Sequence, residues 1–251
     1  MGDPILTADC VSHTFAGPNG GTRALDCVSL AMQPQEFVCV VGPSGCGKST
    51  LLRIMGGLLT PSQGTALLYG EPTTRPRRRV GFVFQKANLM PWRTVLDNVS
   101  LPLELSGENA EVRQRAALDL IQLVGLEGFE RAFPGELSGG MEQRVAIARA
   151  LIHEPEVLLL DEPFGSLDAM TRERMGEELL RIRAARHKTV LMVTHSISES
   201  ILLADRVVAL GPRPGRVRAV FDVPLPRPRD LKMLHSPATG DLSERIREAI
   251  A

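Results

Sequence analysis

The sequence predicts an α/β fold with a mostly parallel sheet, an N-terminal antiparallel β region and an inserted helical subdomain. The first observation is a series of short apolar runs that alternate with helical stretches, at 37–41, 80–84, 157–160, 189–193 and 206–210. Runs of this kind, apolar on both faces, suit a parallel sheet covered by helices. The second observation is a glycine-rich motif directly after the first run, because strand, glycine turn and helix in this order form a recurrent α/β unit.

The flanking segments define the domain plan. Residues 5–33 mix β-branched and apolar residues around a Gly-rich interruption at 17–21, which predicts antiparallel strands joined by a loop. Between about 86 and 155 helical spacing replaces the strands and predicts the helical subdomain. Proline and arginine are frequent beyond residue 210. We therefore expect one main domain over 1–215 and a C-terminal extension over 216–251.

Composition excludes several classes of protein. A chain of 251 residues can bury one sizeable core. Lys plus Arg and Asp plus Glu both number 29, so the basic excess of a nucleic-acid binder is absent. The N-terminus lacks the pattern of a secretion signal, and no run of about 18 apolar residues occurs. We expect a cytoplasmic protein whose link to any membrane comes through a partner.

The cysteines do not form a recognisable metal or redox motif. Cys10, Cys27, Cys39 and Cys46 lack the C-x-x-C spacing of zinc and redox sites. A reducing compartment disfavours disulfides. We expect four free thiols.

Residues 42–49 read GPSGCGKS and fit the phosphate-loop pattern G-x-x-x-x-G-K-[ST], between an apolar run and a helical one. Glycines let the backbone N–H groups point at phosphate oxygens, and the helix N-terminus adds positive charge. Lys48 is expected to reach the β- and γ-phosphates, and Ser49 to ligate Mg²⁺. A thiol at Cys46 in this position is expected to be reactive, unless it is a buried filler. The residues expected to bind ATP here are Gly42, Pro43, Ser44, Gly45, Cys46, Gly47, Lys48, Ser49 and Thr50.

A second motif, VLLLDE, is an apolar strand that ends in two acids. Asp161 at the strand end can hold Mg²⁺ through water, and Glu162 can polarise the attacking water. The two motifs together indicate a phosphate-loop NTPase, which could still be a kinase, a GTPase or a recombinase.

A third motif narrows the class. Ser138, Gly139 and Gly140 follow Leu137 and open a helical stretch at 139–153, so they form a second helix N-terminus able to bind an anion. With LSGG lying between the phosphate loop and the VLLLDEP strand, the chain resembles the ATP-binding cassette family over nearly all of 5–215. The resemblance implies an ATPase coupled to transmembrane transport.

The resemblance also implies roles for further residues. Gln85, expected to end the strand GFVFQ, resembles the glutamine that senses Mg²⁺ and the γ-phosphate and links to the membrane subunit. His195 resembles the switch histidine that contacts the γ-phosphate. Asp168, with Ser166 and Leu167, resembles the loop that touches the opposite subunit. Phe15 lies where the family stacks an aromatic ring on adenine, with core packing as the rival interpretation.

The partners follow from the same resemblance. In this family two subunits pair head to tail, and residues 138–140 of one copy close on the ATP held by the other. The resemblance also implies a separate permease, a solute-binding protein that acts indirectly, and a place on the cytoplasmic face of the membrane. Met141, where many relatives have Gln, indicates a subgroup. The stretches 88–99 and 213–217 resemble the ATPases of nitrate, sulfonate and taurine importers.

Some alternatives remain open at this level. Within the family, the chain could serve an exporter or a lipid transporter. Cassette ATPases that act on ribosomes or in DNA repair usually have two cassettes or a coiled coil, and neither is present here. A phosphate-loop kinase would leave LSGG and His195 without a role. Trp92, the one tryptophan, is expected either to dock a partner helix or to pack inside the helical subdomain.

Overall fold

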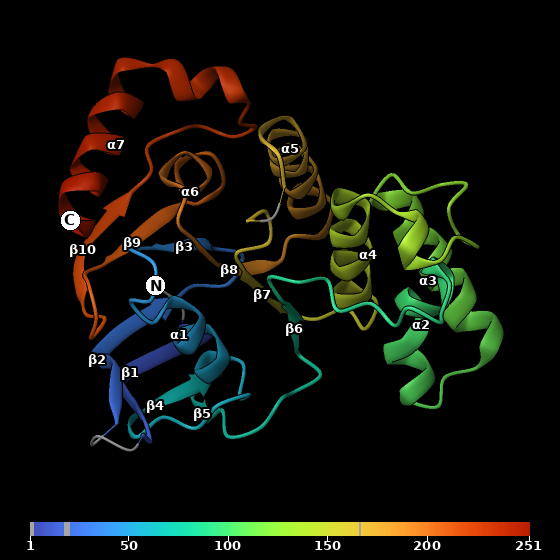
Figure 1. Ribbon diagram of the computed structural model, residues 1–251, viewed down its shortest axis with the longest axis horizontal. Helices are drawn as coiled ribbons and strands as arrows, with labels where there is room; N and C mark the ends of the chain where they lie inside the picture. The colour runs from blue at the N-terminus through green and yellow to red at the C-terminus, as the bar shows by residue number, and fades with distance from the viewer. Residues whose placement is uncertain (1–2, 18–20, 166) are drawn as a thin grey trace. The chain divides into compact units, whose positions relative to one another are not determined.

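The computed structural model describes residues 3–17, 21–165 and 167–251. It comprises two units, which are described separately (Figure 1). The first unit contains residues 1–77 and 188–251, and the second contains residues 78–187.

The first unit begins with an antiparallel sheet in the strand order β2-β1-β4-β5. Buried and exposed residues mix along β1 and β2, as expected for strands with one face on a core. This sheet confirms the N-terminal antiparallel β region. Its strands are β1 (Leu6–Phe15), β2 (Thr22–Met32), β4 (Gln63–Leu68) and β5 (Glu71–Pro72).

A second sheet of the same unit has the order β10-β9-β3-β8. Strand β3 (Phe37–Val41) is parallel to both β8 (Thr189–Thr194) and β9 (Arg206–Leu210). All residues of β3 and β8 are buried, which is the physical reason that both read as unbroken apolar runs. The helical segments of this unit are α1 (Lys48–Met55), α6 (Ile197–Leu203), the 3₁₀ turn η2 (Leu231–His235) and α7 (Pro237–Ile250).

The second unit combines two parallel strands with helices. Strands β6 (Val80–Val83) and β7 (Val157–Asp161) pair in parallel. Helices α2, α3 and α4 contact one another, as Figure 1 shows in green and yellow-green. Within the described residues, no helix is both long and apolar enough to cross a membrane. The helical segments are α2 (Val95–Leu105), α3 (Ala110–Leu123), η1 (Pro134–Glu136), α4 (Gly139–Leu151) and α5 (Ala169–Arg186).

The C-terminal segment is tied to the first unit. Strand β10 (Val217–Asp222) pairs antiparallel with β9. Arg229 is buried, and its guanidinium donates to backbone carbonyl oxygens that include Ala204 O at 2.5 Å and Leu225 O at 3.1 Å. One arginine therefore donates hydrogen bonds to carbonyl groups of both the segment after α6 and the proline-rich stretch. These bonds anchor the proline-rich stretch.

The structure corrects one expectation about the cysteines. Cys10 and Cys27 form a disulfide between β1 and β2, so they are not free thiols. The register of the two strands shifts on both sides of the pair Val11 and Val28, and each cysteine has a positive φ, 44° and 51°. Spacing in sequence cannot reveal this pairing, because it depends on the bulged register of two strands. Cys39 and Cys46 lie outside any disulfide, and burial raises the pKa of the Cys39 thiol well above its usual value.

The disulfide is expected to stabilise the first unit. Since its cysteines are 17 residues apart, loss of the cross-link should lower the free energy of unfolding by about 3 kcal/mol. Urea unfolding of Cys10→Ser should reveal this loss against oxidised wild-type protein. Wild-type protein in reductant is the control and should match the variant; equal stability of oxidised and reduced wild type would contradict the prediction.

Candidate functional site

The phosphate loop connects β3 to α1, and packing requires its glycines. A Cβ at Gly42 would lie 2.7 Å from the Leu210 carbonyl oxygen, and one at Gly47, where φ is 106°, would lie 2.6 Å from the Ala24 carbonyl oxygen. Gly45 differs, because nothing lies within 4 Å of its Cβ position although φ is 76°. The loop is therefore packed tightly at both ends and open at its middle, as a cradle for an anion needs.

Lys48 begins α1 and bends back over this loop. It is 4% exposed, and its Nζ donates to Gly42 O at 2.9 Å and Pro43 O at 3.1 Å. Ser49 and Thr50 follow in the first turn and are half-buried. A buried ammonium held by carbonyl oxygens and a helix N-terminus at the same place favour negative charge in the loop.

His195 lies at the same edge of the sheet as the phosphate loop. Val41 and Thr194 are opposite each other in the parallel strands β3 and β8, so Gly42 and His195 are the next residues at one level. His195 is exposed, and the turn after it is held by Thr194, whose Oγ1 donates to Glu199 and accepts from Ser196 N at 3.0 Å. The structure thus brings together two site residues that are far apart in sequence.

Phe15 ends β1 and is 43% exposed, which argues against the core-packing interpretation. Its ring meets the ring of His13 edge to face, with centroids 4.5 Å apart. The first unit therefore contains Phe15, the phosphate loop and His195.

The second unit brings Gln85 and Glu162 together. Val83 and Leu160 are opposite each other in the parallel strands β6 and β7, so the residues that follow them lie at the same edge of the sheet. The Cβ position of Gly165 lies 3.6 Å from Glu162 Oε2 and 3.7 Å from Gln85 Nε2. Gln85 does not end the strand as expected, because β6 stops at Val83 and Gln85 is exposed beyond it.

The two acids after β7 differ in environment. Asp161 is the last residue of the strand and is 3% exposed. Glu162 is half-buried and has a φ of 43°, a left-handed conformation that costs a non-glycine residue about 1–3 kcal/mol. The turn is closed by Gly165 N, which donates to Glu162 O at 3.0 Å. The backbone thus turns sharply at Glu162, which directs this carboxylate away from the line of the strand.

The LSGG motif forms the N-terminus of α4 as expected. Ser138 is the N-cap, and its Oγ accepts from Met141 N at 3.3 Å. A Cβ at Gly140 would lie 2.6 Å from Thr171 Cγ2, whereas one at Gly139 would lie 3.7 Å from Leu167 Cδ2. Gly140 therefore allows the start of α4 to approach the start of α5, and Ser138 and Gly139 stay exposed.

Asp168 has a role that sequence reasoning missed, since it caps α5. Its Oδ1 accepts from Thr171 N at 3.0 Å. Hydrogen bonds from the Thr171 side chain and backbone lower the pKa of Asp168. An acid just before a helical stretch is the signal that could have revealed the cap. Ser166, expected in the same loop, lies outside the described residues.

A family model described as ABC transporter matches residues 25–165. The chain belongs to this family. The taurine import ATP-binding protein of Rhizobium johnstonii is 47% identical, over 97% of this chain and 95% of that protein. The aliphatic sulfonates import ATP-binding protein of Bacillus cereus is 43% identical over 87% and 86%, and the nitrate import ATP-binding protein of Synechococcus elongatus is 46% identical over 90% and 84%.

Among solved structures, a dimeric ATP-binding cassette in a post-hydrolysis state with ADP and Pi is 35% identical. It has a TM-score of 0.78 and covers 87% of this chain and 98% of that one. The fold-class prediction is therefore confirmed, and so is the activity class: this chain is an ATP-binding, ATP-hydrolysing subunit of an ABC transporter.

Cys46 of this ABC ATPase does not have the expected accessible thiol. It is 1% exposed, and its Sγ lies 2.9 Å from the Cβ position of Gly42. The side chain therefore fills space beneath the phosphate loop. This burial favours the filler interpretation over that of a readily alkylated thiol.

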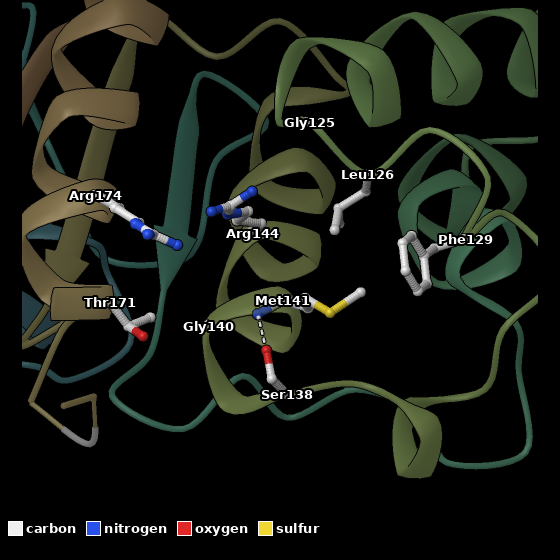
Figure 2. A pocket seen from close by; sticks show the side chains of 9 residues that line it. All are labelled: Gly125, Leu126, Phe129, Ser138, Gly140, Met141, Arg144, Thr171 and Arg174. Atoms are coloured by element: carbon white, nitrogen blue, oxygen red, sulfur yellow. Dashed lines mark hydrogen bonds between the residues drawn. The ribbon is translucent and has the colours of Figure 1, made fainter.

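A cavity of about 250 Å³ adjoins the LSGG motif of this ABC subunit (Figure 2). The guanidinium groups of Arg144 and Arg174 point toward each other between α4 and α5, and Met141 extends toward Phe129 on the other side. Arg144 donates to Met175 Sδ at 3.3 Å, and within the described residues neither arginine pairs with a carboxylate. Sequence reasoning assigned no role to the side chain of either arginine.

A larger groove, of about 500 Å³, lies beside Gln85 and includes Pro91, Pro134 and Gln143. The segment at its rim is held firmly: Arg149 donates to the carbonyl oxygens of Ala87 and Asn88, and the Asn98 side chain bonds both backbone groups of Met90. Trp92 on this segment is 72% exposed, so the interpretation of Trp92 as a packed residue of the helical subdomain is wrong.

The close approach of α4 and α5 predicts unequal effects at the two glycines of LSGG. Gly140→Ala forces the new methyl group against the stiff Thr171 side chain, so it should be about 1–3 kcal/mol less stable than Gly139→Ala, the matched control. Thermal and urea unfolding of both variants measure this difference. Thr171→Ser removes Cγ2 and should restore the Gly140→Ala protein; equal stability of the two alanine variants would contradict the packing argument.

Proposed function

We propose that this ABC ATPase works as a head-to-tail pair and energises import of a small oxyanion or sulfonate-like solute through a separate permease. The observation that carries the proposal is the placement of the phosphate loop and His195 at one sheet edge, with Gln85 and Glu162 gathered at the edge of the second unit. The import class and the kind of solute are supported by the named relatives, which match most of the chain.

The chemistry of the expected ligand side chains suits Mg²⁺ and a triphosphate. Ser49, Gln85 and Asp161 offer a hydroxyl, an amide carbonyl and a carboxylate, which are the hard oxygen ligands that Mg²⁺ prefers. When bound, Mg²⁺ neutralises charge on the phosphate oxygens. Lys48 exchanges its carbonyl partners for the β- and γ-phosphates, and the open side of the loop at Gly45 leaves room for them.

The chemical step is assigned to side chains at the sheet edges. Glu162 accepts a proton from the attacking water, and its turn directs the carboxylate beside Gln85. His195 contacts the γ-phosphate from the edge next to the phosphate loop.

Pairing completes the site. Ser138 and Gly139 are exposed at the N-terminus of α4, so they can close on the ATP of a second copy. Asp168, which caps α5, is assigned to the contact with the second copy. The subunit sits on the cytoplasmic face of the membrane against its permease.

The role of Glu162 is separable from nucleotide binding. Glu162→Gln should retain ATP affinity, lower kcat by roughly 10²–10⁴-fold and accumulate an ATP-bound dimer, because only proton transfer is lost. Lys48→Ala is the matched control and should weaken ATP binding itself, because it removes a phosphate contact that exists before reaction. Nucleotide titration, phosphate release and size-exclusion chromatography distinguish the two; wild-type turnover in Glu162→Gln would refute the role.

The groove beside Gln85 is the proposed permease contact. Purification from membranes should yield this subunit with its permease and a solute-binding protein, whereas a complex that lacks any binding protein would point to an exporter.

Trp92→Ala should lose the permease and substrate-stimulated hydrolysis, because exposed aromatic residues anchor interfaces. The isolated variant should keep its stability within about 0.5 kcal/mol, as surface substitutions do. A permease complex that survives Trp92→Ala would show that docking lies elsewhere.

A further inference from the structure

We propose that His13 is a positioning residue for the nucleotide: it holds the Phe15 ring in the orientation that receives adenine and thereby sets the affinity for ATP. The inference rests on the proposed stacking of adenine on Phe15 and adds the residue that supports the ring. All the groups involved belong to the first unit.

The first observation is the ring contact itself. His13 and Phe15 are two residues apart in β1, and their rings are in contact. Their centroids are 4.5 Å apart and their planes cross at 76°. This is the edge-to-face arrangement that aromatic quadrupoles favour. Since His13 is 8% exposed and Phe15 is 43% exposed, His13 is the fixed partner and Phe15 the accessible one.

The second observation is an unsatisfied polar atom. His13 Nδ1 is buried and has no hydrogen-bond partner among the described residues. A phenylalanine or leucine could pack beside Phe15 without losing a hydrogen bond to water. What His13 offers Phe15 is therefore its aromatic edge, which a phenylalanine would also provide.

The third observation is the backbone around His13. The register between β1 and β2 shifts on both sides of this residue, between Val11 and His13 and between His13 and Thr14. Thr14 N donates to Ser62 Oγ at 3.1 Å, which holds the end of the strand in place. Irregularities of this kind re-aim side chains, so the direction of the Phe15 ring depends on this stretch of β1.

The fourth observation links the ring to the phosphate loop. His13 is opposite Leu25 in β2, and Leu25 Cδ2 lies 2.7 Å from the Cβ position of Gly47. The Ala24 carbonyl oxygen lies 2.6 Å from the same position. One pair of strands therefore carries the ring and packs against the loop.

The test is steady-state hydrolysis by the isolated subunit. His13→Leu removes the aromatic edge and should raise KM for ATP about 2- to 10-fold, the factor expected for one edge-to-face pair, with kcat and Tm nearly unchanged. His13→Phe keeps an aromatic edge and should restore KM. His13→Met replaces His13→Leu if that variant is insoluble. An unchanged KM in the leucine variant, or an equal rise in the phenylalanine variant, overturns the proposal.

A double-mutant cycle shows whether His13 acts through Phe15. Phe15→Leu should raise KM, and adding His13→Leu to it should change KM no further, because the ring it positions is gone. Additive increases in KM would show that His13 acts by another route and would overturn the proposal. A wild-type KM in Phe15→Leu would instead refute adenine stacking itself. Failure of stacking on Phe15 and failure of the role of His13 are therefore distinguishable.

Discussion

The pairing of parallel strands is the constraint on which the site depends. Parallel strands end at one edge, so the residues that follow them meet even when they are far apart in the chain. In the first unit the pairing of Val41 with Thr194 places the phosphate loop beside His195. In the second unit the pairing of Val83 with Leu160 places Gln85 and Glu162 near each other. A shift of register by one residue would separate both sets and turn side chains to the opposite face.

Close backbone approaches then fix the loops on these edges. Gly47 lies against β2, and Gly140 brings the start of α4 against α5. Each glycine is required by a neighbouring atom as well as by its motif. The phosphate loop and LSGG are therefore rigid in their surroundings, which suits groups that must meet a phosphate in fixed geometry. The strained turn at Glu162 extends the same principle to the acid that we propose as the base.

The exposed parts of the molecule have different physical character. Trp92 is solvent-exposed on a segment held by hydrogen bonds from Arg149 and Asn98, so a fixed backbone carries an exposed apolar side chain. The cavity near Arg144 and Arg174 is cationic on one side and apolar on the other. By contrast, the proline-rich C-terminal stretch is anchored by Arg229. Proline has no backbone N–H to donate, and the Arg229 guanidinium supplies donors to backbone carbonyl oxygens instead.

The sequence alone determined the fold class, the family, and the strands that precede the phosphate loop and the two acids. All of these depend on local patterns. Apolar runs, the glycines of residues 42–49 and the LSGG motif are short-range signals. Only the tertiary structure decided how cysteines pair, where buried side chains lie and which rings touch. The Cys10–Cys27 disulfide, the burial of Cys46, the exposure of Trp92 and the contact of His13 with Phe15 each depend on strand register or on packing. Register and packing are set by contacts between distant segments, and no local pattern encodes them.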